Sequence, residues 1–221
     1  MPDQRAKLTW TQDQVPVSGR FDDPYYSLHN GLEETRHVFL SGNDLPARFV
    51  PGFHIAELGF GTGLNMLTAW SEWENSGQAS PLSFTSFEAF PMSTPDMQRA
   101  LAMFPELAPW SARFLQGWTG TSCRLDTLRL DVVHGDARVT LPGWAGRADA
   151  WFLDGFSPAK NPELWDVDLM REVSAHTHTG GTAATYTAAG FVRRGLEEAG
   201  FQVTRGPGYG RKRHMTQAVK S

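Results

Sequence analysis

The chain has 221 residues, of which 40% are hydrophobic, so we expect one compact domain. Its formal net charge of −4 argues against a protein that coats nucleic acid non-specifically, because such binding depends on an excess of Lys and Arg. No run approaches the roughly 18 consecutive apolar residues of a membrane-spanning helix, and Met1–Leu8 lacks the apolar segment of a secretion signal. The single cysteine, Cys123, permits no internal disulfide and no multi-cysteine zinc site, which is typical of a reducing compartment and predicts a cytoplasmic protein with no membrane partner.

Residues 1–52 show no regular alternation of strand and helix patterns, and we treat them as an N-terminal appendage. From residue 53 to residue 221 such patterns alternate, which predicts a single α/β domain with a doubly wound, mostly parallel sheet covered by helices on both faces. The predicted strands are 53–58, 83–88, 123–133 with an irregularity near Asp126, 150–153, 182–186, a strand from 201, and 214–219. The predicted helices are 64–74, 94–107, 164–176 and 188–199. This number of strands favours a seven-stranded, Rossmann-like sheet.

A glycine-rich turn follows the first predicted strand, with Gly59, Gly61 and Gly63 at alternate positions. Glycines at such a turn let the backbone approach a ligand closely. The NAD fingerprint has its third glycine one residue later, where this chain has Leu64, so the spacing disfavours an NAD oxidoreductase. The turn is similar to that of the S-adenosylmethionine-dependent methyltransferases. The resemblance implies that it packs against the adenosine and methionine portions of that cofactor, through Glu57 at the amino group and through Gly59, Phe60, Gly61, Thr62, Gly63 and Asn65.

Two further carboxylates follow predicted strands. Glu88 ends the second strand, close to the position where an acidic residue binds the ribose hydroxyls in Rossmann-type sites. Asp136 follows the third strand region and is a candidate acceptor for the adenine amino group. The alternatives are a solvated carboxylate at Glu88 and a turn-forming role for Asp136.

The fourth predicted strand ends at Asp154, at the start of a loop that runs to Pro162. Open α/β sheets bind ligands at the carboxyl edge of their strands, so we expect Asp154 to face both cofactor and substrate. Phe156 in the same loop is a candidate platform for stacking on a base. The alternative for Asp154 is a helix-capping role. Histidines lack partners at metal-ligand spacing, so we predict no metal.

Six blocks of sequence together resemble the methyltransferases of the tRNA 5-aminomethyl-2-thiouridine pathway, over roughly residues 20 to 219. The blocks are Phe21–Ser27, Gly31–Leu40, the glycine turn with Asn65, Asp154–Pro162 followed by Trp165, Thr187–Leu196 and Gly208–Arg213. The resemblance implies transfer of a methyl group from S-adenosylmethionine to the amine of 5-aminomethyl-2-thiouridine at wobble position 34. Some relatives are fused to an FAD-dependent oxidase. Because no second domain follows Ser221, we expect no FAD and a separate enzyme that supplies the aminomethyl nucleoside.

An amine that is protonated in water is no nucleophile, so the expected site must bind it neutral and in line with the transferred methyl group. We predict that Asp154 accepts a hydrogen bond or a proton from the amine, and that Tyr25, Tyr26 and Glu34 help to orient it. The wobble base belongs to the single-stranded anticodon loop of tRNA, so it can be splayed out and stacked. The expected phosphate contacts are Arg211, Lys212 and Arg213.

Two other functions remain open on the sequence alone. A methyltransferase that acts on a small molecule or a protein side chain uses the same cofactor residues. A catalytically silent scaffold that binds nucleotide or tRNA keeps the same fold. Methyl transfer to a defined acceptor separates all three hypotheses.

Overall fold

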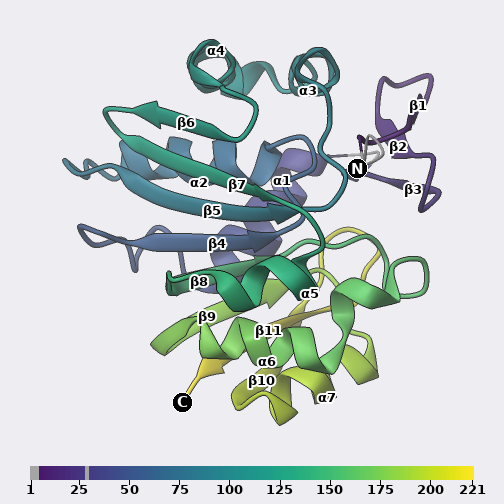
Figure 1. Cartoon of the computed structure of the whole chain (residues 1–221), viewed down its shortest axis with the longest axis vertical. Helices are drawn as coiled ribbons and strands as arrows, with labels where there is room; N and C mark the ends of the chain where they lie inside the picture. Colours follow the sequence, from purple (N-terminus) through teal and green to yellow (C-terminus); the bar gives the residue numbers. More distant parts are fainter. Residues whose placement is uncertain (1–4, 28–29) are drawn as a thin grey trace.

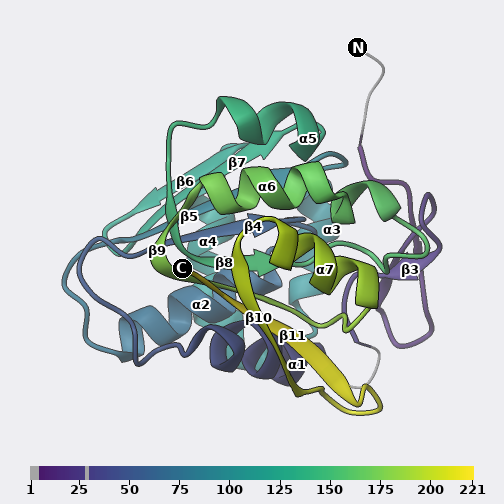
Figure 2. The same cartoon turned by 90° about the horizontal axis from the view of Figure 1, so that it is seen from below.

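The computed structural model describes residues 5–27 and 30–221. Residues 1–4, part of the Met1–Leu8 stretch considered above, and residues 28–29, part of the predicted appendage, lie outside the described residues. The described part contains a three-stranded sheet near the N-terminus and an eight-stranded sheet with helices on both of its faces (Figures 1 and 2). The doubly wound α/β fold is therefore confirmed.

The larger sheet has the strand order β10-β11-β9-β8-β4-β5-β7-β6. Its pairings are parallel from β9 through β8, β4 and β5 to β7, whereas β6 and β11 run antiparallel to their neighbours. The strands are β4 (His54–Leu58), β5 (Leu82–Glu88), β6 (Ser122–Leu125), β7 (Leu128–His134), β8 (Ala148–Leu153), β9 (Thr177–Thr185), β10 (Phe201–Pro207) and β11 (His214–Lys220).

The sheet has eight strands, so the predicted number of seven is wrong by one. Asp126 and Thr127 form a turn that divides the predicted segment 123–133 into β6 and β7. These two strands pair in antiparallel register with Leu125 opposite Leu128. The apolar alternation does not reveal the reversal, because the side-chain period of two is the same on both sides of a tight turn.

Seven α-helices occur in the described residues, and two predicted helices differ from them. The helices are α1 (Gly31–Thr35), α2 (Leu64–Asn75), α3 (Thr94–Leu101), α4 (Ala108–Gly117), α5 (Ala137–Thr140), α6 (Val167–Ala175) and α7 (Gly190–Glu198). Helix α3 ends before predicted position 107 because Phe104, which precedes a proline, has non-helical dihedrals. Helix α6 starts at Val167, since the Asp166 side chain caps it by accepting a hydrogen bond from the Asp168 N–H.

The hydrophobic core has two clusters, one on each face of the larger sheet. Successive residues of β4 point to opposite faces, so Ile55 belongs to the cluster under α2 and Ala56 to the cluster under α6 and α7. Leu32 and Phe39 from the N-terminal region pack into the first cluster. The N-terminal region thus shares a core with the sheet, and the domain boundary at residue 52 stays a prediction.

All the parallel strands end at one edge of the larger sheet, and chain segments gather there. The small sheet of β1 (Leu8–Trp10), β2 (Pro16–Ser18) and β3 (Asp23–Pro24) lies beside this edge (Figure 1). The loops after β4, β5, β7, β8 and β9 begin at the same edge. Within the described residues, no helix has the length and apolar character needed to cross a membrane.

Candidate active site

A cavity of about 640 Å³ lies at the carboxyl edge of the parallel strands. Its lining comes from the strap, which we define as residues 20–27, from α1, from the glycine turn 59–65, from the ends of β5 and β7, from the loop 154–164, and from Tyr186 and Lys212. This volume falls within the roughly 300 to 1,000 Å³ of small-molecule sites. The cavity is therefore large enough to bind a nucleoside-sized ligand.

The glycine turn after β4 has a backbone that other residues cannot easily adopt. Gly59 and Gly61 have φ angles of 93° and 53°, in the left-handed region that favours glycine. A side chain on Gly59 would begin 2.5 Å from the carbonyl oxygen of Asp154. The missing side chain thus lets the turn pass directly against the end of β8, which places both segments on the cavity.

Glu88 at the end of β5 is nearly buried and lines the cavity. Its two carboxylate oxygens accept hydrogen bonds from the backbone N–H groups of Gly61, at 2.9 Å, and Phe90, at 2.7 Å. Burial raises the pKa of Glu88, and these backbone donors oppose the rise. A carboxylate has about four acceptor positions, so Glu88 retains acceptor capacity for a ligand.

Asp154 is joined to a buried network through Asn65. The Asn65 Nδ2 donates to Asp154 Oδ2 at 2.6 Å and to Glu57 Oε1 at 2.9 Å. The Asn65 Oδ1 accepts from the Thr35 hydroxyl at 2.9 Å. Burial raises the pKa of Asp154 to about 7, and the negative charge of Glu34 adds to the rise, whereas the Asn65 hydrogen bond opposes it. Asp154 therefore gains or loses a proton near neutral pH.

Glu57 is fully buried beneath this network and is absent from the cavity lining. Its second oxygen, Oε2, accepts from the Ser86 hydroxyl at 2.7 Å. Burial raises the pKa of Glu57 well above its usual value. In this structure Glu57 holds Asn65 and Ser86, and a direct contact with a cofactor amino group stays a prediction.

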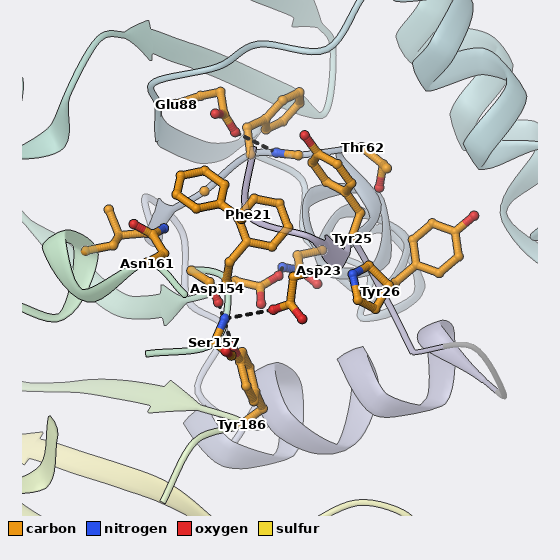
Figure 3. Close-up of a pocket in the computed structure, with 18 of the residues that line it drawn as sticks. Phe21, Asp23, Tyr25, Tyr26, Thr62, Glu88, Asp154, Ser157, Asn161 and Tyr186 are labelled. Atoms are coloured by element: carbon orange, nitrogen blue, oxygen red, sulfur yellow. Dashed lines mark hydrogen bonds between the residues drawn. The ribbon is translucent and has the colours of Figure 1, made fainter. Parts of the chain in front are cut away.

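Aromatic rings of the strap cover the loop after β8. In the view of Figure 3, Phe21 lies between Glu88 and Asp154. The ring centroid of Phe156 is 4.9 Å from that of Phe21, and that of Tyr25 lies 5.0 Å away in an edge-on arrangement. One face of Phe156 is therefore already occupied by Phe21.

The two tyrosines of the strap remain neutral hydroxyls at physiological pH. Burial raises the pKa of Tyr25 far above its usual value, with a further contribution from the charge of Glu88. Burial raises the pKa of Tyr26 to about 12. The Tyr26 hydroxyl donates to the carbonyl oxygen of Ala100 at 3.3 Å. Both tyrosines line the cavity, and neither acts as a base in the neutral range.

A cluster of Glu34, Lys212 and Tyr186 closes the cavity on the side of β9 and β11. Lys212 Nζ lies 2.8 Å from Glu34 Oε1 and 4.0 Å from the centroid of the Tyr186 ring. The Tyr186 hydroxyl donates to the carbonyl oxygen of Gly155, the residue that follows Asp154, at 2.8 Å. This cluster ties α1, β9 and the β10–β11 hairpin to the Asp154 loop.

Three other predicted site residues are either engaged with a neighbouring residue or located outside the cavity. Asp136 lines the cavity, but it also caps α5 and forms an ion pair with Arg138 at 2.5 Å, whose hydrogen bond lowers the pKa of Asp136. Asp136 therefore has a structural role as a helix cap, which differs from the turn-forming alternative, and a contact with adenine stays a prediction. Arg211 and Arg213 are exposed and do not line the cavity, unlike Lys212 between them.

A family model supplies the identity of this fold. The model, described as S-adenosyl-L-methionine-dependent methyltransferase, matches residues 105–221, more than half of the chain. The chain belongs to this methyltransferase family.

Curated relatives of the methyltransferase are longer than this chain. This chain is 46% identical over 225 residues to the tRNA 5-methylaminomethyl-2-thiouridine biosynthesis bifunctional protein MnmC of Pseudomonas aeruginosa strain UCBPP-PA14. The match covers 96% of this chain and 34% of that protein. MnmC of Pseudomonas paraeruginosa strain DSM 24068 / PA7 matches with the same identity and coverage. The chain therefore spans about a third of the length of these relatives.

Solved structures agree with the fold of the methyltransferase. A crystal structure of MNMC2 from Aquifex aeolicus has a TM-score of 0.76 and 26% identity, covering 98% of this chain and 71% of that chain. The precorrin-6y C5,15-methyltransferase of Geobacter metallireducens has a TM-score of 0.51 at 12% identity, covering 96% and 98% of the two chains, and shares the fold alone.

The polar groups that line the cavity of the methyltransferase fit the functional groups of S-adenosylmethionine. Glu88 offers acceptors to a diol, and the glycine turn allows a close approach of backbone to ligand. Thr62 and Asn161, both nearly buried, add polar atoms to the lining. Among the described residues, no cluster of three or more His, Cys, Asp or Glu side chains is placed to hold a metal ion.

Sequence reasoning missed several lining residues of the methyltransferase. Tyr186 follows the strand next to β8, so the same carboxyl-edge argument applies to it as to Asp154. Asp23 lies in a block that carried the family resemblance, and its Oδ2 accepts a hydrogen bond from the Ser157 N–H at 2.9 Å (Figure 3). No local pattern connects Asp23 to Ser157, because the pair is formed only by the path of the strap.

Proposed function

We propose that this methyltransferase transfers a methyl group from S-adenosylmethionine to the amine of 5-aminomethyl-2-thiouridine at wobble position 34 of tRNA. The observation that carries the proposal is the 46% identity, over 96% of the chain, to a protein named for the biosynthesis of the methylated nucleoside. The six sequence blocks and the buried, titratable carboxyl of Asp154 in the cavity support it.

We propose that the cofactor occupies the part of the cavity between the glycine turn and Glu88. Glu88 accepts hydrogen bonds from the ribose hydroxyls, and Gly59 and Gly61 allow the backbone to contact the ligand. When bound, S-adenosylmethionine supplies a methyl group on a positively charged sulfur. Asp136 accepts a hydrogen bond from the adenine amino group through a carboxylate acceptor position that the ion pair with Arg138 does not use.

Asp154 has the position and the proton affinity to prepare the amine. An alkylammonium ion must lose a proton before its nitrogen has a free electron pair, and the methylated amine carries a positive charge. With a pKa of about 7, the Asp154 carboxylate accepts such a proton and still releases it to water at neutral pH. Tyr25 and Tyr26 orient the substrate as neutral hydroxyls. Glu34, whose charge is largely offset by Lys212 at 2.8 Å, helps to orient the amine through its carboxylate oxygens.

The wobble base needs space beside Phe156 if it stacks there. Phe21 covers one face of Phe156 at 4.9 Å, so Phe21 must move when a base takes that position. Such a movement is local, because Phe21 belongs to the strap and is only half-buried. The anticodon loop is single-stranded and delivers a base that is not paired.

The deciding experiment measures methyl transfer from labelled S-adenosylmethionine to tRNA that carries 5-aminomethyl-2-thiouridine. The control is the same tRNA without the aminomethyl group. We expect label only in the aminomethyl tRNA. Tight binding of S-adenosylmethionine without label in either tRNA would keep the family assignment and remove this substrate, whereas label in a small molecule or protein would favour another acceptor.

Replacing Asp154 by Ala tests the role of its carboxyl group. We expect D154A to lose turnover by about 10² to 10⁴-fold, the usual contribution of general acid–base catalysis. Affinity for S-adenosylmethionine should change little, because Glu88 and the glycine turn hold the cofactor in this proposal. Isothermal titration and initial rates separate the two quantities, and an unchanged rate would exclude Asp154 from the reaction.

A further inference from the structure

Charged side chains around the cavity differ in whether they have a partner of opposite charge. On the side of the strap and the Asp154 loop, Arg138 pairs with Asp136 at 2.5 Å, and Lys160 Nζ lies 3.4 Å from Asp23 Oδ1. A paired cation attracts a further anion only weakly, since the two charges largely cancel at a distance. Arg20 of the strap also lines this side and has no ion-pair partner among the described residues, but Glu163 lines it as well, so this side carries no net excess of positive charge.

The opposite side carries unpaired positive charge. It consists of the hairpin tip, which we define as residues 208–213 between β10 and β11, and of the first turns of α7. Arg194, Arg211 and Arg213 are exposed there, and none of them forms an ion pair with any residue that the structure describes. The formal charge of the whole chain is −4, so this positive surface is a local feature.

The hairpin tip is fixed next to the cavity. Lys212, in the middle of the tip, lines the cavity and is held by Glu34 at 2.8 Å. His37 Nε2 lies 2.8 Å from the carbonyl oxygen of Pro207 at the base of the tip. Arg211 and Arg213 therefore extend from a segment whose position relative to the cavity is set by two contacts.

The first turns of α7 lie along the same edge of the molecule as the hairpin tip (Figure 2). Helix α7 begins at Gly190, shortly after Tyr186 of the cavity. The Arg194 guanidinium reaches back toward the start of the helix, because its Nη1 lies 3.2 Å from the position of a side chain on Gly190. The acidic residues of α7, Glu197 and Glu198, belong to its last turn.

Two aromatic side chains accompany the arginines. Phe191, in the first turn of α7, is 46% exposed, which is unusual for a ring of this size. Tyr209 of the hairpin tip is half-buried, with its ring centroid 5.8 Å from that of His37. Exposed rings beside arginines are typical of surfaces that bind unpaired nucleotides, because rings stack on bases while arginines contact phosphates.

We infer that the hairpin tip and the first turns of α7 form the surface that binds the phosphates of the anticodon stem-loop, through Arg194, Arg211 and Arg213. This inference rests on the proposed function. The surface adjoins the cavity at Lys212, so a strand held there can insert one base toward Asp154. It also explains how an acidic chain binds an acidic substrate, since unpaired arginines gather on one side of the site, whereas the positive charges on the other side are balanced by carboxylates.

The test compares two triple variants of the full chain. R194A/R211A/R213A removes the inferred contacts, and R124A/R129A/R147A removes three exposed arginines near the amino ends of β7 and β8, at the opposite edge of the sheet. Dissociation constants for aminomethyl tRNA are measured over a range of salt concentrations, together with kcat and KM for methyl transfer. Binding of S-adenosylmethionine checks that each variant is folded.

We expect the first variant to raise the Kd and KM for tRNA by about tenfold or more, with kcat retained at saturation and cofactor binding unchanged. The slope of log Kd against log salt should decrease by about two to three, because each lost phosphate contact removes about 0.7 to 0.9 of a released counterion. The second variant should match the unmodified chain. Equal effects of both variants, or no effect of either, would overturn the inferred surface while leaving the proposed function intact. Failure of the unmodified chain to methylate any tRNA, with cofactor binding intact, would overturn the proposed function and this surface with it.

Discussion

Asn65 connects the buried carboxyl groups of the site. The sequence predicted that Asn65 contacts the cofactor, but its amide is already engaged with Glu57, Asp154 and Thr35. An amide has two N–H donors, and both are directed to carboxyl groups that share a low-dielectric environment. We therefore expect Asn65 to act through Asp154, by holding its carboxyl in place and favouring its ionised form.

Replacing Asn65 by Ala should shift the pH dependence of the reaction. The Asn65 hydrogen bond lowers the pKa of Asp154 against the effect of burial, so its loss should raise that pKa. The acid limb of kcat/KM should then move to higher pH by about one unit. T35V removes only the hydroxyl that Asn65 accepts from and should give a smaller shift. The same midpoint in N65A and the unmodified chain would show that Asn65 does not act on Asp154.

Asp154 should also make the folded state less stable at high pH. Its pKa is about 7 in the folded chain and about 3.9 when unfolded, so the folded state binds the proton more tightly. Stability attributable to this group is therefore lost as pH rises from about 4 to about 7, and the loss is complete above that range. D154N removes the titration. Urea unfolding gives the free energy of unfolding of D154N and of the unmodified chain at each pH. We expect the value for D154N minus the value for the unmodified chain to be about 3 kcal/mol larger at pH 8 than at pH 5.

At the scale of elements, the site depends on the glycine turn passing close to the end of β8. Gly59 combines a φ of 93° with a backbone oxygen of Asp154 only 2.5 Å from where a side chain would begin. Gly77, at the end of α2, has a φ of 73° with no atom within 4 Å of the corresponding position. The two glycines thus separate the effect of backbone conformation from the effect of close approach.

We expect G59A to destabilise the fold more than G77A. The change at Gly77 adds only the strain of a left-handed residue, about 1 to 2 kcal/mol. The change at Gly59 adds a steric conflict with the Asp154 backbone and should cost about 2 to 4 kcal/mol. Free energies of unfolding from urea titrations compare the two variants. A similar loss in both would mean that the turn and β8 can separate easily.

At the scale of the whole molecule, cofactor binding should stabilise the fold, because the cavity joins segments from the strap to the β10–β11 hairpin. S-adenosylmethionine at 100 times its Kd should contribute about 2.7 kcal/mol, which corresponds to a rise in Tm of about 5 to 10 °C for a chain of this size. E88Q should lose much of this rise. E198Q, outside the cavity, should keep it. An equal rise in both variants would remove Glu88 from the cofactor site.

The sequence by itself determined the fold class, the position of the glycine turn, and the positions of Glu88 and Asp154 at the carboxyl ends of two strands. These features depend on local periodicity and on residues adjacent in the chain. The carboxyl-edge rule for parallel strands then places such strand ends together. The reversal at Asp126 was missed, since a tight turn leaves the period of the strands unchanged. The direct cofactor roles of Glu57 and Asn65 remain predictions.

The tertiary structure alone decided what surrounds Asp154. The strap brings Phe21 onto Phe156, and the β10–β11 hairpin brings Lys212 to Glu34, across separations of more than a hundred residues. The tertiary structure also neutralised some cations and left Arg211 and Arg213 unpaired among the described residues. Burial, ion pairing and pKa depend on distances between segments remote in sequence, and no local pattern of residues encodes those distances.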